Sequence, residues 1–177
     1  AEGFALTGAV EDADVAILNT CSFIGPARDE SESVITDLLA AKAQGDLRGV
    51  IVAGCLPEKF RPEVEAKFPQ VDAFLGLSDY SNVARIVEEV LKGRKVREDS
   101  GGRAPQGQGE FLRLLQTPRR YAYLRPSHGC DQECGFCIIP QIRGKQISKP
   151  VEAVVEEVEA LVAQGVREVV MVAEDST

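Results

Sequence analysis

"RRYAYLRPSHGCDQECGFC", residues 119–137, is an alternating apolar segment that runs directly into three cysteines within eight positions. The alternation in "RRYAYLRP" predicts a strand. The amphipathic "VEAVVEEVEALVAQG" that follows predicts a helix ended by Gly165, and "REVVMVAED" predicts a further strand. Strand, cysteine loop, helix and strand are the opening of a parallel α/β domain. Two strands do not close a barrel, so we expect this chain to be a fragment.

The first half of the chain also alternates between strand and helix patterns. Short apolar runs predict strands at Val15–Leu18, at Val50–Ala53 and in "AFLG". Helical patterns follow each run; the first places Val34, Leu38, Leu39 and Ile35 near one face and stops at Gly45, the second contains Pro62 as a site for a kink, and the third ends at Gly93. The pattern predicts a small parallel sheet. The residues before Val15 resemble a helix end, so we expect another strand and helix upstream.

A change of composition separates the two halves. The stretch from Lys92 to Gly109 holds five glycines and little that is apolar, which indicates a linker or an exposed hairpin. The sequence therefore predicts an amino-terminal domain over residues 1–92, a linker over 93–117 and the start of a second domain over 118–177.

Composition restricts the class of protein. The 177 residues are 44% hydrophobic with a net charge of −8, and no apolar run approaches the length of a membrane span. We expect a cytoplasmic location, where thiols stay reduced. Between Phe111 and Pro150 there are seven basic and two acidic residues. Nearby cations favour thiolates, although a solvated basic face explains the same charge.

Cys130, Cys134 and Cys137 have the spacing C-x3-C-x2-C. A disulfide knot does not suit a reduced compartment or an odd total of five cysteines. Zinc ligands usually come as two separated pairs, although His128 makes a three-cysteine, one-histidine site formally possible. Three thiolates on a four-iron cluster would leave one iron open, which is what catalysis needs. The zinc and iron–sulfur interpretations both remain.

The two remaining cysteines each follow a predicted strand, Cys21 in "NTCSFI" and Cys55 in "AGCLPE". Ligands bind outside the carboxyl ends of parallel strands, so the two thiols could converge on one site. Free cysteines are also commonly small buried side chains. The pattern alone does not separate these interpretations.

The cysteine loop, with Phe136 before its last cysteine and a strand before it, resembles the radical S-adenosylmethionine (SAM) superfamily. "ILNTCSFI" and "VAGCLPE" resemble the amino-terminal domain of its methylthiotransferases. The resemblance implies a partial TIM barrel and two 4Fe–4S clusters with SAM on the first, held by Cys130, Cys134 and Cys137. Cys21 and Cys55 match two of the three ligands of the second cluster, and the third would lie upstream of Ala1.

"LLQTPRRYAYLRPSHGC" and "CGFCIIPQIRGKQISKP" resemble the RimO-type branch, which modifies an aspartate of a small-subunit ribosomal protein. This resemblance implies a transferase that adds a methylthio group to the aspartate β-carbon, with a flavodoxin- or ferredoxin-type electron donor and no membrane partner. The alternatives are a tRNA adenosine methylthiotransferase, with tRNA as partner, and a non-catalytic zinc or iron–sulfur module. We expect the chain taken alone to be inactive.

Further candidates for contact with the cofactor are Glu174, Asp175, Arg143 and Phe136. The resemblance implies that the loop containing Glu174 and Asp175 touches the ammonium of SAM, a charge-assisted contact; helix capping explains the same residues. Arg143 could pair with a carboxylate of substrate or SAM through two hydrogen bonds, or could be a loop arginine on the basic face.

Overall fold

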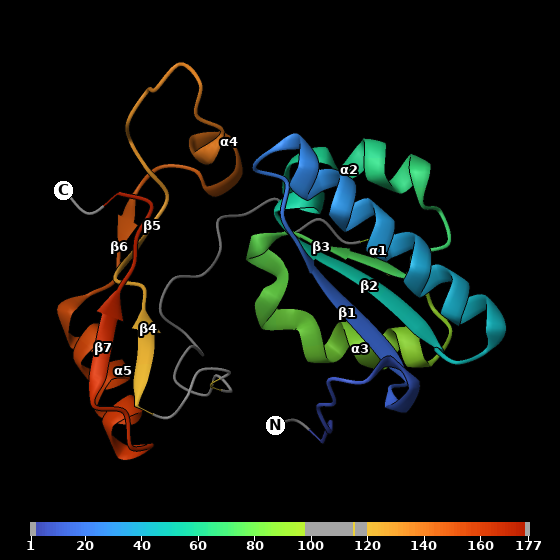
Figure 1. The fold of residues 1–177 in the computed structure, drawn as a ribbon, viewed down its shortest axis with the longest axis horizontal. Coiled ribbons are helices and arrows are strands. Elements are labelled where there is room, and N and C mark those ends of the chain that lie inside the picture. Colours follow the sequence, from blue (N-terminus) through green and yellow to red (C-terminus); the bar gives the residue numbers. More distant parts are fainter. Residues whose placement is uncertain (1–2, 98–114, 116–119, 176–177) are drawn as a thin grey trace. The chain divides into compact units, whose positions relative to one another are not determined.

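The computed structural model describes residues 3–97, 115 and 120–175 (Figure 1). The chain forms two compact units, Ala1–Ala104 and Pro105–Thr177, and each is described by itself. Most of the predicted linker, 93–117, lies outside the described residues, so the proposed domain bounds stay a prediction.

Unit 1 contains a three-stranded parallel sheet in the order β1-β2-β3. Its strands are β1 (Val15–Thr20), β2 (Gly49–Gly54) and β3 (Ala73–Leu75), preceded by a short 3-10 turn, η1 (Val10–Asp12). All three predicted strands are confirmed. β1 and β2 are aligned along their whole length, from Val15 opposite Gly49 to Thr20 opposite Gly54.

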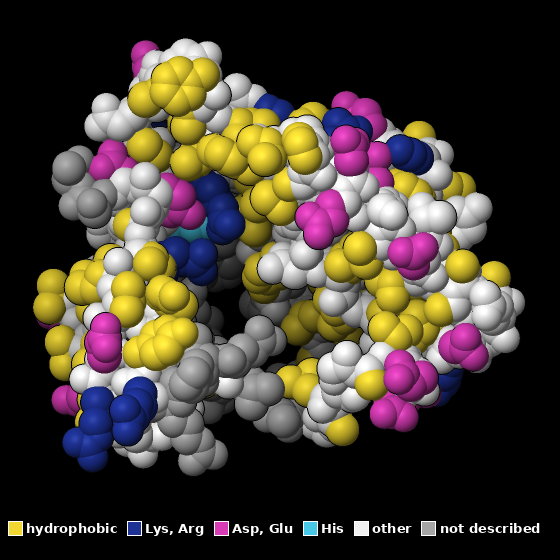
Figure 2. Space-filling model, in the orientation of Figure 1, with side chains coloured by type: hydrophobic (Ala, Val, Ile, Leu, Met, Phe, Trp, Pro, Cys, Tyr) yellow, Lys and Arg dark blue, Asp and Glu magenta, His cyan; other side chains and the backbone are white. Residues whose placement is uncertain are grey.

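Helices cover both faces of this sheet (Figure 1). They are α1 (Gly25–Gln44), α2 (Cys55–Lys67), the 3-10 helix η2 (Leu77–Asn82) and α3 (Val83–Leu91). The central strand β2 is buried throughout: Val50 and Val52 face the core beneath α1 and α2, whereas Ile51 and Ala53 face α3. This alternation produces a three-layer α/β/α unit. Acidic side chains are spread over the outer surface of α1 and α2 (Figure 2).

The ends and the kink of these helices follow local chemistry. Gly45 caps α1 in the left-handed conformation, as its position predicted. α2 is interrupted at Phe60, shortly before Pro62, because proline lacks an N–H and its ring clashes with the preceding turn. On α1 the fully buried residue is Ile35, while Leu38 and Leu39 are partly buried against the same core.

Unit 2 contains two parallel strands, β4 (Tyr121–Leu124) and β7 (Glu168–Met171), and the helix α5 (Val151–Ala163). Its core consists of Ala122, Leu124, Leu161 and Val166. The predicted order of strand, loop, helix and strand is confirmed, and with it the α/β class. None of the helices in the described part of the chain is both long enough and apolar enough to cross a membrane.

Between β4 and α5 the structure adds elements that the sequence pattern did not predict. Two short strands, β5 (Ser127–His128) and β6 (Ile147–Ser148), pair in antiparallel fashion and flank α4 (Ile139–Arg143). Strands of two residues carry no measurable periodicity, which is why they were missed. The β5–β6 pair joins the two ends of the segment that contains the cysteine loop and α4.

Candidate metal centre and cofactor site

The three clustered cysteines line one cavity of about 350 Å³. Cys130 is buried, Cys137 is half-buried and Cys134 is exposed, and all are free thiols. The remaining lining comes from Asp131, Gln132, Glu133, Pro140, Gln141 and Lys145. One lysine and two carboxylates around the thiols make the lining mixed in charge rather than basic.

The base of the cysteine loop depends on close main-chain packing. Cys130 N–H donates to the carbonyl of Gly144 at 3.2 Å. Gly129 precedes it with a φ of 80°, and a Cβ there would overlap the main-chain oxygen of Lys145 and lie 2.7 Å from that of Gly144. The chain leaving α4 therefore lies directly against the first cysteine, and only glycine leaves room for it.

Asp175, beyond the end of β7, faces the first cysteine. Its Oδ2 lies 3.6 Å from Cys130 Sγ, which donates to it, and 3.4 Å from Gln132 Nε2. The main-chain N–H of Gln132 donates to the same sulfur at 3.4 Å. A carboxylate and an N–H donor therefore lie beside the cysteine that is most deeply buried of the three.

Glu174, next to Asp175, has different neighbours. Its Oε1 lies 3.7 Å from Arg143 Nε and 3.8 Å from His128 Nδ1. Distances of this length suit an ion pair or a water-bridged contact rather than a direct hydrogen bond. The two candidate acids are therefore distinguished: Asp175 faces the cysteine loop, and Glu174 faces Arg143. Arg143 has a carboxylate partner within its own chain.

Phe136 extends away from this cavity. Its side chain is 96% exposed and does not line the space between the cysteines. An aromatic side chain left in water is a surface available to a flat ligand.

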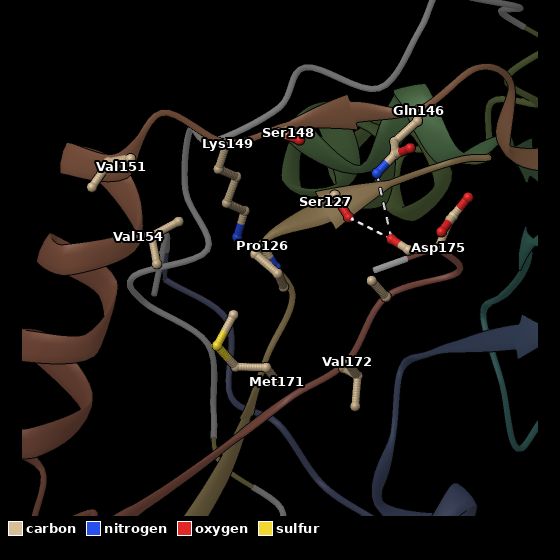
Figure 3. Close-up of a pocket in the computed structure, with 11 residues that line it drawn as sticks. Pro126, Ser127, Gln146, Ser148, Lys149, Val151, Val154, Met171, Val172 and Asp175 are labelled. Atoms are coloured by element: carbon tan, nitrogen blue, oxygen red, sulfur yellow. Dashed lines mark hydrogen bonds between the residues drawn. The ribbon is translucent and has the colours of Figure 1, made fainter. Parts of the chain in front are cut away.

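A second cavity, of about 410 Å³, has Asp175 in its lining (Figure 3). Its apolar side comes from Pro126, Val151, Val154, Met171, Val172 and Ala173, and its polar side from Ser127, Gln146, Ser148, Lys149 and Asp175. Asp175 therefore lines this cavity while its carboxylate contacts a cysteine of the first.

In unit 1, Cys21 and Cys55 follow residues that are paired in the sheet, Thr20 and Gly54. Thr20 Oγ1 donates to the carbonyl of Ala53 at 2.6 Å and accepts from the N–H of Leu56 at 3.3 Å. This hydroxyl joins the two segments that carry the cysteines. Cys21 is exposed, and Cys55 is the half-buried first residue of α2.

Two family models match the chain. The model described as "Uncharacterized protein family UPF0004" covers residues 1–76, and that of the radical SAM superfamily covers residues 124–177. The first range contains Cys21 and Cys55, and the second contains the three cysteines of the loop.

Curated relatives match across both units. Ribosomal protein uS12 methylthiotransferase RimO of Heliobacterium modesticaldum is 42% identical over 99% of this chain and 38% of its own length. The proteins of the same name from Syntrophus aciditrophicus and Trichlorobacter lovleyi are 41% identical over 99% of this chain, each across 39% of its length. Nearly the whole chain is therefore similar to RimO-type methylthiotransferases. It spans about two fifths of the length of these relatives.

The resemblance to RimO-type methylthiotransferases that the motifs indicated is thereby confirmed, and so is the radical SAM fold class. Within residues 3–97, 115 and 120–175, no three His, Cys, Asp or Glu side chains are arranged to hold a single metal ion. A four-iron cluster presents a separate iron to each thiolate. The cavity lined by three free thiols therefore fits that group without their converging on one point.

Sequence reasoning missed several residues that shape this site: Ser127, Gly129, Asp131 and Gln146. The main-chain N–H of Gln146 donates to Asp131 Oδ1 at 3.0 Å, which ties the cysteine loop to the segment before β6. Only the glycine beside the first cysteine left a signal in the sequence, because the other three act through contacts between distant segments.

Proposed function

We propose that this chain forms the cluster-bearing part of a radical SAM enzyme that adds a methylthio group to the β-carbon of an aspartate in ribosomal protein uS12. The observation that carries the proposal is the cavity lined by Cys130, Cys134 and Cys137, with the carboxylate of Asp175 at its side. The names of the relatives support this substrate for the family. The cytoplasm is the location that such a substrate requires.

Cys130, Cys134 and Cys137 would each ligate one iron of a 4Fe–4S cluster and leave the fourth iron to SAM. When bound, the cluster supplies the electron that cleaves SAM, taken from a flavodoxin- or ferredoxin-type donor. The protein's part is to orient the cofactor and exclude water. Cys21 and Cys55 would ligate a second 4Fe–4S cluster.

Three residues in or near the cysteine loop would contact SAM or the substrate. Asp175 would accept hydrogen bonds from the SAM ammonium, because its carboxylate lies beside Cys130. Arg143 would pair with the carboxylate of SAM or of the substrate, held in place by Glu174 at 3.7 Å. Phe136, whose ring is exposed outside the cavity, would offer an aromatic surface to the cofactor from the cysteine loop.

Anaerobic reconstitution of the chain with iron and sulfide tests the cluster assignment. We compare the unmodified chain with two variants, Cys130→Ala/Cys134→Ala/Cys137→Ala and Cys21→Ala/Cys55→Ala. The unmodified chain should bind about four irons at the loop with the absorption and EPR signals of a 4Fe–4S cluster. The triple variant should lose this signal and the double variant should keep it. Stoichiometric zinc without iron uptake would overturn the proposal.

The substrate is tested separately by mass spectrometry of uS12 and tRNA from cells with and without the gene. A thiomethyl group on an aspartate of uS12 that disappears with the gene supports the proposal. A modification that disappears from tRNA adenosine instead identifies the alternative target and overturns the assignment to uS12.

A further inference from the structure

Gln146 touches both the cysteine loop and the loop that carries Asp175. Its main-chain N–H donates to Asp131 Oδ1 at 3.0 Å, and Asp131 directly follows Cys130. Its side-chain Nε2 donates to the main-chain carbonyl of Asp175 at 3.4 Å. One residue in the short segment between α4 and β6 therefore connects the first turn of the cysteine loop to the end of β7.

The carbonyl of Asp175 is held from two directions. Ser127 Oγ donates to it at 3.2 Å, and Nε2 of Gln146, the residue just before β6, also donates to it (Figure 3). The carboxylate of the same residue points to the other cavity, where it meets Cys130 Sγ and Gln132 Nε2. Asp175 thus has its main chain fixed on one side and its charged group presented on the other.

This arrangement matters because Asp175 lies outside any regular element, beyond Met171, where β7 ends. No strand ladder holds its main chain there. A charge-assisted hydrogen bond depends steeply on distance and angle, so the carboxylate recognises a cation well only if its main chain is held still. Hydrogen bonds from neighbouring side chains do this for many binding groups.

We propose that Gln146 is a positioning residue for the amino group of SAM: by holding the carbonyl of Asp175 it sets the carboxylate relative to the cysteine loop. The inference rests on the proposed function. The positioning role requires a side chain as long as that of glutamine that ends in an N–H donor. Leucine fills similar space without a donor, and serine at position 127 supplies the second donor to the same carbonyl.

The test measures binding of two ligands by the anaerobically reconstituted chain. One ligand is SAM, and the other is its deaminated analogue, which has a keto group in place of the amine. Binding is followed by the change in the EPR signal of the reduced cluster. Gln146→Leu should raise the Kd for SAM by about three- to tenfold, the effect of losing one neutral hydrogen bond. The Kd for the deaminated analogue, the iron content and the Tm should not change.

Gln164→Leu is the matched control. Gln164 Nε2 also donates to a main-chain carbonyl, that of Ala160 at 3.2 Å, at the exposed end of α5. Its removal should leave both Kd values unchanged. Ser127→Ala should act in the same direction as Gln146→Leu, because both residues hold the same carbonyl.

The outcomes separate the inference from the proposed function. A chain that takes up no cluster, or whose cluster does not respond to SAM, refutes the proposed function itself. If the unmodified chain binds SAM and the Gln146→Leu variant has the same Kd as the unmodified chain for each of the two ligands, the positioning role is wrong. If Gln146→Leu raises the Kd for SAM and the Kd for the deaminated analogue by the same factor, the positioning role is also wrong, because the effect would not depend on the amino group. Should Gln146→Leu fail to hold iron, Ser127→Ala decides: unchanged SAM binding there overturns the inference.

Discussion

Lys149 Nζ lies 2.8 Å from Glu157 Oε2 within unit 2, and the two side chains are only 7% and 2% exposed. The lysine directly precedes Pro150 and α5, and the glutamate lies in the middle of that helix. The ion pair therefore links the segment just before α5 to the middle of that helix. Lys149 also lines the second cavity. Removing two charges from water is costly, so a buried pair of this kind is sensitive to the loss of one partner.

Lys149→Met should lower the free energy of unfolding of unit 2 by about 3–5 kcal/mol, because it leaves the Glu157 carboxylate buried without the lysine ammonium. Urea unfolding followed by circular dichroism measures the change. Lys145→Met removes an exposed lysine from the same unit and is the control. The double variant Lys149→Met/Glu157→Leu should recover much of the loss. A loss below about 1 kcal/mol in the single variant contradicts the prediction.

Glu32 joins α1 to α2 and should make the stability of unit 1 depend on pH. Its Oε2 lies 2.6 Å from Lys67 Nζ and its Oε1 lies 3.1 Å from Arg28 Nε. The hydrogen bond from Lys67 and then that from Arg28 hold the pKa of the Glu32 carboxyl below its ordinary value of 4.5, against the opposing effect of burial. The ionised form is thus favoured by folding.

Because the folded-state pKa is lowered, the stabilisation is present above pH 4.5 and disappears as the pH falls through that value and then through the lower folded value. Lys67 is half exposed, so we expect only about 0.5–1 kcal/mol at neutral pH. Urea unfolding of Glu32→Gln and the unmodified chain should show this difference at pH 7, and the difference should shrink steadily as the pH falls below 4.5. Glu30→Gln, at an exposed position on α1, is the control. A difference that persists unchanged in acid would show that Glu32 acts through packing instead.

Gly129→Ala should disrupt the base of the cysteine loop. Its φ of 80° is costly for alanine, and the added Cβ would overlap the main-chain oxygens of Lys145 and Gly144. We expect a loss of at least about 1–3 kcal/mol in the stability of unit 2, measured on the cluster-free chain. Gly135→Ala is the matched control within the same loop, because its Cβ would meet nothing within 4 Å. Equal stability of the two variants would contradict the close approach.

Asp175→Asn and Glu174→Gln should have unequal effects on SAM binding. Asp175 faces Cys130, so loss of its charge should raise the Kd for SAM by about ten- to a hundredfold, the range for a hydrogen bond to a charged group. Glu174 faces Arg143 and His128, and its replacement should have the smaller effect. Binding is measured by EPR titration of the reconstituted chain. A larger effect at Glu174 would reverse the assignment of the two acids.

The elements of the fold were largely predictable because each has a local signature. The apolar runs of β1 and β2, the glycine after α1 and the proline-associated kink in α2 are all readable within a few residues of sequence. The grouping of Cys130, Cys134 and Cys137 on one cavity also follows from their spacing. The short strands β5 and β6 were not predictable, because they are stabilised by each other rather than by a pattern of their own.

The amino-acid sequence by itself determined the order of strands and helices, the position of the cysteine loop and the strand ends that carry Cys21 and Cys55. These depend on periodicity and on neighbours along the chain. Only the tertiary structure decided that Asp175 rather than Glu174 meets Cys130, across 45 positions of sequence, and that Gln146 holds Asp175 across 29. Such contacts arise where separate segments are brought together in space, and no local pattern encodes which of two adjacent carboxylates will point toward the thiol.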